Sequence, residues 1–421
     1  MSLLRKIIAG TMVMSSVALA SETRVDTLQN IGGIQDETDT FTYAGRVTHY
    51  SLALLELGTS DDAKTWAAAM TKLSPGLSMG VAVNRHTWQS SYFADENSLL
   101  MQDRFMFSAL ADSKSGADDA VFAPGDRSID VLAGFALNDS DSFGLRLSMA
   151  KERAKVSSTT ASTSTEQTTS ATELGAGYSS VGGSAIDVGF SLLLSDDYKY
   201  ADVTAGSKTG AELKAKATVI RGRWLASAKS SGLFAEGVLA TRSSKATVTK
   251  ANVDKTGKFS EQEMKASVGY VHAPEGQSTK MFASADLYKT SSKGPKASGN
   301  ADTFASTLST SSDAVKVDAQ WINASLSGEG KFMDNFGAMF GTSYTLMGSV
   351  VEKDNLDKTK SEAEITSPSD SNMWSLGLFW ATEKARVDAS FAKKLLHNGP
   401  YFVAGNTTSP MLTRISATVN F

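Results

Sequence analysis

Alternation of apolar and polar residues at every second position is the feature of this sequence that most limits its fold. Near the C-terminus the apolar positions are Ile415, Ala417, Val419 and Phe421, with polar residues between them. A period of two is the repeat of a β-strand, because successive side chains of a strand point to opposite faces. The sequence therefore predicts an all-β protein.

The same alternation recurs along the whole chain and predicts about 16 strands, within a range of about 14 to 18. The segments that carry it are about 47–57, 76–88, 99–111, 128–138, 143–149, 174–178, 186–194, 213–219, 232–248, 264–270, 281–287, 315–321, 336–346, 374–380, 385–391 and the C-terminal strand. We expect the apolar stripe of each segment to face one environment and the polar stripe another.

The connections between these segments alternate in length. Short turns near 140, 182, 230, 275, 333 and 383 alternate with long polar stretches that begin near 157, 199, 291 and 353. An antiparallel up-and-down transmembrane β-barrel has this arrangement, with one trimmed rim and one elaborated rim. A soluble β-sandwich also alternates, but its interior faces would not be so rich in glycine, serine and charge.

Residues 1–20 are predicted to be a signal peptide that is cut after Ala20, since Arg5 and Lys6 precede a short apolar stretch that ends in Ala-Leu-Ala. Residues 21–45 are then an N-terminal periplasmic or lumenal segment, and 46–421 are the barrel with long extracellular loops. The chain has no cysteine, which excludes disulfides, thiol catalysis and Cys-based metal sites.

Charge and chemistry exclude two further classes of function. The formal net charge is -4, so no basic footprint for nucleic acid is expected. The four histidines, His49, His86, His272 and His397, lie in no recognised catalytic motif. We therefore expect neither an enzyme nor a cofactor, and we interpret the acidic stretch at 36–39 as a solvated turn.

The signal sequence, the alternating loop lengths and the strand that ends in Phe421 together resemble Gram-negative outer-membrane barrels of the general porin type. In that class the C-terminal strand is read by the barrel-assembly machinery, so the resemblance gives this role to Phe421, Val419, Ala417 and Ile415. It also implies an outer-membrane location, contact with outer-membrane lipid and small hydrophilic solutes as cargo. Assembly as a homotrimer is left open.

Residues opposite the apolar stripes are expected to line an aqueous lumen. The candidates are Arg146, Lys214, Lys216, Glu236, Asp318, Arg386, Asp388 and Arg414. Two long segments, 89–127 and 291–314, are long enough to fold inward and narrow the pore, and the first carries Asp112, Lys114, Asp118, Asp119, Asp126 and Arg127.

Passive diffusion of small hydrophilic solutes and ions through a water-filled barrel is the function that this pattern favours. Two alternatives stay open at this point. In one, residues 21–41 plug the barrel of a transporter for hydrophobic ligands. In the other, the barrel anchors loops that act as a surface adhesin or a structural element.

Overall fold

The structure is a computed structural model, and it describes residues 21–29, 31–58, 65–85, 128–158, 163–204, 207–227, 230–250, 253–294, 315–354, 359–365, 373–391 and 412–421. The predicted signal peptide, the candidate strand at 99–111 and the candidate constriction segment at 89–127 lie outside these residues. So does the candidate constriction segment at 291–314, except for residues 291–294, which form the end of a strand.

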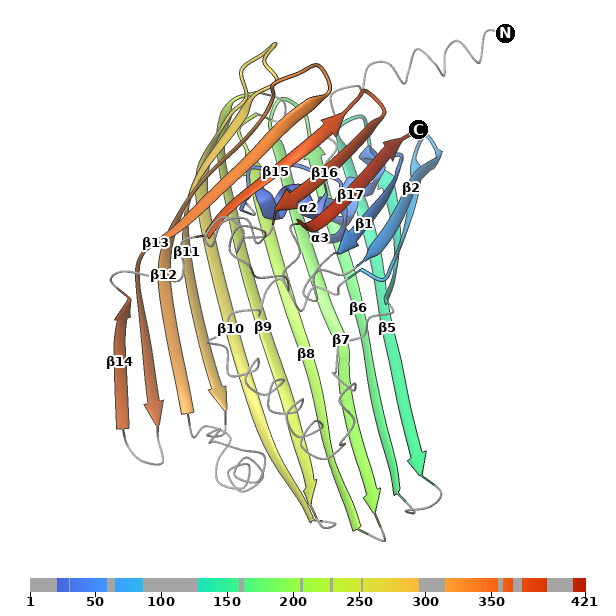
Figure 1. The fold of residues 1–421 in the computed structure, drawn as a ribbon, viewed down its shortest axis with the longest axis vertical. Coiled ribbons are helices and arrows are strands. Elements are labelled where there is room, and N and C mark those ends of the chain that lie inside the picture. The colour runs from blue at the N-terminus through green and yellow to red at the C-terminus, as the bar shows by residue number, and fades with distance from the viewer. Residues whose placement is uncertain are drawn as a thin grey trace, which may run out of the picture.

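The described strands form one antiparallel sheet that closes on itself (Figure 1). Consecutive strands pair along the chain, and the last strand pairs with the first from Leu52 opposite Asn420 to Gly58 opposite Arg414. The strands are β1 (Leu52–Gly58), β2 (Trp66–Ser74), β3 (Leu77–Val83), β4 (Ser128–Ala136), β5 (Asp141–Ser158), β6 (Thr163–Val181), β7 (Ala185–Thr204), β8 (Ser207–Leu225), β9 (Gly232–Lys250), β10 (Val253–His272), β11 (Lys280–Gly294), β12 (Val315–Lys331), β13 (Phe336–Asp354), β14 (Thr359–Ile365), β15 (Met373–Ala381), β16 (Ala385–Phe391) and β17 (Leu412–Asn420).

The closed ring has 16 strand positions, because β14 and β15 occupy the same position. β14 pairs with the second half of β13, from Gly348 to Asp354, and β15 pairs with its first half, from Phe336 to Ser343. The predicted fold class and strand number are confirmed. The set of strands differs from the prediction at β2, whose Trp66–Ser74 segment the alternation did not single out, and at β14, which lies in the stretch from 353 that was expected to be a loop.

A band of apolar side chains covers the outer face of the ring. Large side chains such as Leu145, Phe190, Ile220, Leu239 and Val268 are 41% to 61% exposed, although each would be buried in the core of a soluble protein. A closed barrel leaves no unpaired strand edge, so its backbone groups are satisfied without water. The exposed apolar band on such a sheet is the surface that faces lipid.

The wall is much taller on one side of the ring than on the other. Strands β5 to β13 have 15 to 20 residues, whereas β1 to β4 and β15 to β17 have 7 to 9. A tilted strand needs about 9 to 11 residues to cross the hydrocarbon layer, so the tall side extends well beyond it (Figure 1). The segments that begin near 157 and 199 were expected to be loops, and that prediction is wrong because they continue the strands β5 to β8.

The polarity of the two faces reverses along the tall strands. In β8 the exposed side chains near the short turns are apolar, as at Trp224 and Ile220, whereas farther along the strand Lys214 is exposed and Leu213 is buried. The apolar stripes at 213–219 and 315–321 were expected to face lipid, and this is wrong. Above the membrane layer the outer face meets water, so the apolar stripe lies inside.

The N-terminal segment lies inside the ring at the end where the short turns are (Figure 1). It contains the helices α2 (Glu22–Thr27) and α3 (Asp39–Thr42) and the 3-10 helix η2 (Ala44–His49). α2 contacts β13, β15, β16 and β17, while η2 contacts β3 to β6. Within the described residues, no helix has both the length and the apolar character that a membrane-crossing helix needs. We call residues 21–50 the plug.

The C-terminal strand completes the ring, so its loss should prevent barrel formation. Ala417 lies opposite Leu55 of β1 and Val387 of β16, and the Phe421 N–H donates to the carbonyl oxygen of Ser51 at 3.1 Å. We predict that Phe421→Lys, or a tag placed after Phe421, lowers the amount of folded barrel in the outer membrane, measured by heat-modifiable gel mobility. Val83→Lys in β3, an exposed apolar position away from the closing strand, serves as the control. Normal folded levels of the Phe421 variant would contradict the assembly role.

Candidate functional site in the barrel lumen

The plug joins opposite sides of the barrel through two apolar clusters. Leu28, Ile31 and Ile34 pack with wall residues that include Phe234 of β9, Phe282 of β11 and Phe379 of β15. Phe41, Val47 and Tyr50 pack with Leu52, Leu54, Trp66, Ala68, Met70, Ala82 and Leu132 of β1 to β4. Because these clusters lie on different parts of the ring, the plug spans the lumen.

Glycines in the wall let the plug backbone approach the strands closely. A Cβ atom at Gly144 of β5 would lie 2.2 Å from the carbonyl oxygen of Ala44, and one at Gly177 of β6 would lie 2.4 Å from the Ala44 nitrogen. A Cβ at Gly189 of β7 would lie 2.3 Å from the carbonyl oxygen of Thr42. No side chain fits at these separations, so the wall is shaped for this segment.

One cluster of buried charges holds helix α2. Arg24 donates to both carboxylate oxygens of Glu329 in β12, at 2.7 and 2.6 Å. Arg386 of β16 donates to Glu329 at 3.2 Å and to Asp388 at 2.7 Å. Ser21, whose hydroxyl caps α2, donates to Asp388 at 3.3 Å. The plug therefore joins a charge network that already links β12 and β16.

A second cluster holds α3 and η2 around Asp187 of β7. Arg46 donates to both oxygens of Asp187 at 2.7 Å each. Arg223 of β8 donates to Asp187 at 2.9 Å and to Asp39 at 2.5 Å, and also to the carbonyl oxygen of Ile34 at 2.9 Å. The Asp187 side chain is fully buried, and the side chains of Arg46 and Arg223 are only 5% and 3% exposed.

Further polar contacts hold the plug against the remaining strands. Arg414 of β17 lies 2.7 Å from Asp26 and 3.3 Å from Glu22. Thr23 donates to Glu56 of β1 at 2.5 Å. Breaking a buried ion pair by removal of one partner costs about 3 to 5 kcal/mol, so the whole set opposes spontaneous release of the plug.

Burial and neighbouring charges shift the pKa values of several plug residues. Burial alone would lower the pKa of Arg24, but the Glu329 carboxylate outweighs that effect and raises it. Arg46 has a raised pKa for the same reason beside Asp187. Burial, and then the positive charge of Arg46, lowers the pKa of His49 to about 4. The plug thus carries fixed arginine charges and a neutral histidine at neutral pH.

Asp36 is the plug carboxyl that titrates near neutral pH. Burial, followed by repulsion from Asp39, raises its pKa to about 7. The N–H groups of Thr38 and Asp39 donate to its Oδ1 atom at 2.7 and 3.3 Å. The Thr38 hydrogen bond stabilises the charged carboxylate, but it lowers the pKa by less than burial and Asp39 raise it.

The structure places five of the eight predicted lumen residues on the inner face, where they bond to the plug or to other wall charges. Arg414 pairs with Glu22 and Asp26 of α2, Asp388 accepts from Ser21, the cap of α2, and Arg386 donates to Glu329 and Asp388 of the wall. Glu236 accepts from Arg221 at 2.5 Å and from the Tyr43 hydroxyl at 3.5 Å. Arg146 pairs with Glu173. That any of them lines an open pore stays a prediction.

Lys214, Lys216 and Asp318 lie on the outer face, so the prediction that they line the lumen is wrong. Their neighbours in the strands point inward and are buried: Ala215 and Ala217 in β8 are 2% and 5% exposed, and Val317 in β12 is 9% exposed. Because successive side chains of a strand point to opposite faces, these three charges point outward. These three charges belong to the part of the wall where the polarity of the faces is reversed.

The C-terminal residues assigned to barrel assembly keep the predicted orientation. Val419 and Phe421 are 49% and 67% exposed, whereas Ser416 and Thr418 between them are 1% exposed. Sequence reasoning missed Arg24, Arg46, Asp187, Arg223 and Glu329 as a connected set. The inward glycines at 144, 177 and 189, one on each of three neighbouring strands, were the sequence signal for an inserted segment. Residues without a side chain on the inner face leave room for one.

Removal of the shared carboxylate at Asp187 should loosen the plug. We predict that Asp187→Asn leaves Arg46 and Arg223 without their common counter-ion and speeds plug opening by at least about tenfold. The chain has no cysteine, so a single Thr40→Cys, a position with 0% exposure, reports opening through its rate of maleimide labelling. Asp139→Asn in an exposed turn is the matched control. Equal labelling rates in the two variants would contradict the role of Asp187.

Plug docking should weaken as the pH rises towards neutrality. The docked plug holds the Asp36 proton with a pKa of about 7, against an ordinary value of 3.8, so docking is strongest below the ordinary value and is lost progressively up to about pH 7. We expect the cysteine of Thr40→Cys to be better protected from maleimide labelling at about pH 5 than at about pH 8. The labelling rate at each pH is divided by that of unfolded protein at the same pH. Asp36→Asn should remove this difference. A difference that persists in Asp36→Asn would assign it to another group.

Comparison with known proteins finds no matching family model and no matching curated protein. Solved structures with similar folds include a Pseudomonas aeruginosa FadL homologue, with 10% identity, a TM-score of 0.42 and coverage of 95% of this chain and 98% of that one. The transport unit of the autotransporter AIDA-I from Escherichia coli has 11% identity, a TM-score of 0.33 and coverage of 75% and 98%. The translocator domain of NalP from Neisseria meningitidis has 9% identity, a TM-score of 0.31 and coverage of 88% of each chain.

These likenesses concern the fold and say nothing of cargo. The closed antiparallel ring of 16 strand positions, its exposed apolar band and its trimmed rim make this chain a transmembrane β-barrel of the outer-membrane type, and its family is not identified.

Proposed function

We propose that the protein is a plugged outer-membrane transporter that moves apolar or amphipathic small molecules through its barrel. The observation that carries this proposal is the plug itself, which crosses the lumen and is bonded to β1, β7, β8, β12 and β17 through hydrogen bonds and ion pairs. A permanently open pore does not need such a segment, whereas a gated pore needs one to close its lumen.

The inner surface beyond the plug supports an apolar cargo. Leu193 of β7, Ala217 and Val219 of β8, and Val238 and Ala240 of β9 form one inward apolar cluster. Val315 and Val317 of β12 form a second, with Val350 packed against them. The buried residues of the two clusters are at most 9% exposed, so in this proposal a cargo reaches them only when the groups that cover them move aside. An apolar solute that takes the place of those groups is stabilised by about 25 cal/mol for each Å² of apolar surface it buries.

Transport in this proposal requires no covalent chemistry and no cofactor. The cargo enters at the end of the barrel opposite the short turns. The plug then moves away from the wall, and the cargo leaves at the rim with the short turns. The buried ion pairs set the resistance to opening. Contact with the barrel-assembly machinery and the oligomeric state stay predictions.

Passive diffusion of hydrophilic solutes, favoured by the sequence, is the competing function. It has one supporting observation, the charged inner wall at the level of the plug, which includes Arg146, Glu173 and Lys265. In that case the plug is a fixed constriction and water passes beside it.

Deletion of residues 22–38 distinguishes the two functions. We predict that the intact protein is electrically silent in planar bilayers and that the deletion variant conducts, because the lumen is then open across the membrane. A steady conductance of the intact protein that the deletion barely changes would reject the gated transporter and favour the diffusion pore.

A disulfide that locks the plug provides the matched control. The hydroxyl oxygens of Ser21 and Ser416 of β17 are 2.6 Å apart, so Ser21→Cys with Ser416→Cys places two thiols side by side in a chain without other cysteines. Oxidised protein should fail to take up a fluorescent fatty acid into vesicles, and reduction should restore uptake. Uptake that is equal in both redox states would show that α2 need not leave the wall.

A further inference from the structure

A row of lysines crosses the outer face of the tall wall, beyond the apolar band. Strand pairing places Lys214 of β8 opposite Lys245 of β9, and Lys245 opposite Lys258 of β10. On the next strands Lys293 of β11 lies opposite Lys316 of β12, and Lys316 opposite Lys353 of β13. Lys353 in turn lies opposite Lys360 of β14. We call these seven residues the lysine row.

The lysine row stands at a constant distance from the lipid-facing band. On five successive strands, β8 to β12, the lysine is six positions from the last large apolar residue of the outer face. The pairs are Ile220 and Lys214, Leu239 and Lys245, Met264 and Lys258, Leu287 and Lys293, and Ile322 and Lys316. Unrelated surface lysines would have no reason to keep this spacing on strands that run in both directions.

Six residues of a strand correspond to about 20 Å along the strand and, at the tilt usual for such barrels, about 14 Å along the membrane normal. The polar headgroup layer begins directly outside the hydrocarbon. Lysine side chains are long and can extend their ammonium groups towards it. The lysine row therefore runs through or directly above the headgroups of the outer leaflet.

Three lysines of the row are not neutralised by the described part of the protein. Lys214 pairs with Glu212 at 2.9 Å, and Lys316 pairs with Asp318 at 2.5 Å. Asp197 of β7 is the cross-strand neighbour of Lys214. Within the part of the chain that the structure describes, Lys245, Lys258 and Lys293 have no carboxylate within ion-pairing distance. Like charges opposite one another on a sheet destabilise it, so such a row calls for an anionic partner outside the chain.

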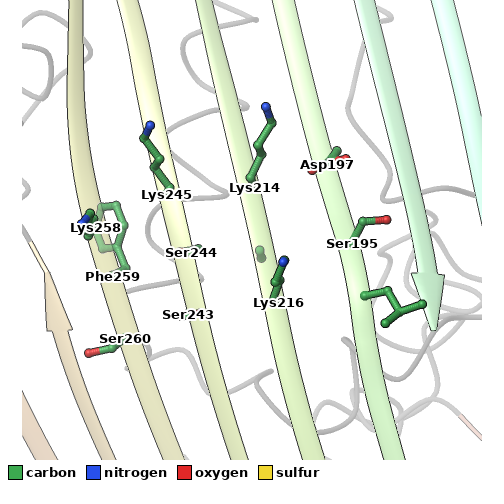
Figure 2. Close-up of a pocket in the computed structure, with 12 residues that line it drawn as sticks. Ser195, Asp197, Lys214, Lys216, Ser243, Ser244, Lys245, Lys258, Phe259 and Ser260 are labelled. Carbon is green, nitrogen blue, oxygen red and sulfur yellow. The ribbon is translucent and has the colours of Figure 1, made fainter. Parts of the chain in front are cut away.

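The outer surface is hollowed where the lysines are densest. A depression of about 640 Å³ is lined by four lysines, one carboxylate, and serine and apolar residues (Figure 2). Its charged residues are Lys214, Lys216, Lys245, Lys258 and Asp197, and its serines include Ser195, Ser243 and Ser260. The labelled side chains come from the neighbouring strands β7, β8, β9 and β10. Ammonium and hydroxyl groups together are the donors that a phosphate group accepts from.

We propose that the lysine row binds the phosphate groups of anionic glycolipid headgroups in the outer leaflet. The apolar band below it meets the acyl chains of the same molecules, so the lipid contact is continuous from chain to headgroup. This proposal is independent of the cargo, because the row lies on the outer face and the plug lies inside.

The test removes the charge of the three unpaired lysines. Lys245→Gln, Lys258→Gln and Lys293→Gln are combined, and the folded barrel is reconstituted in phosphatidylcholine vesicles with or without a phosphorylated glycolipid. We expect the amount of glycolipid bound per barrel to fall at least about twofold in the triple variant, and the rise in unfolding temperature that glycolipid gives the parent protein to disappear.

Two matched variants separate this effect from general charge loss and from misfolding. Lys72→Gln, Lys331→Gln and Lys384→Gln remove the same charge at exposed positions of the short-turn rim and should leave glycolipid binding unchanged. Replacement of the three row lysines by arginine keeps the charge and should keep binding. Heat-modifiable gel mobility selects folded protein in every case.

Two results would overturn the proposal. One is equal glycolipid binding by the parent and the glutamine triple variant. The other is equal stabilisation of the parent in detergent by inorganic phosphate, lost in the same triple variant, which would assign the row to a soluble phosphate ligand and not to a lipid.

Discussion

Closure of the sheet is the constraint on which the rest of this structure depends. A backbone N–H or C=O group without a partner is too costly to expose to hydrocarbon, and the pairing of β17 with both β1 and β16 closes the ring between its last and first described strands. Once the ring is closed, the two faces of every strand belong to different solvents. The apolar band, the charged inner wall and the position of the plug all follow from that division.

Charge pairing inside the ring is the second organising interaction. Glu329 and Asp187 each bind one arginine of the plug and one arginine of the wall. Neither carboxylate has its full set of donors without the plug. Insertion of residues 21–50 thus completes networks that the barrel leaves partly satisfied, and it does so on opposite sides of the lumen. Specific docking of this short segment is explained by these networks together with the two apolar clusters and the wall glycines.

The sequence predicted the fold well because the period of two is a direct consequence of strand geometry, and one signal per strand is enough to count strands. It was less successful on which face an apolar stripe occupies. At 213–219 and 315–321 the alternation is regular, but the stripe faces inward because those residues lie above the membrane layer, and alternation carries no information about depth. The plug contacts were not predictable for another reason: Arg24 and Glu329 are 305 positions apart, and no local pattern links them.

The unequal height of the wall has a consequence within the plane of the membrane. Seen along the membrane normal, the barrel has a lysine-bearing tall flank formed by β8 to β14 and a low flank formed by β1 to β4 and β15 to β17. A molecule of this shape has no rotational symmetry about the normal, so its neighbours in the bilayer meet different surfaces depending on the direction of approach. Its rotation about the membrane normal then determines which surface each neighbour meets. In a crowded membrane such molecules would be ordered by this rotation as well as by position.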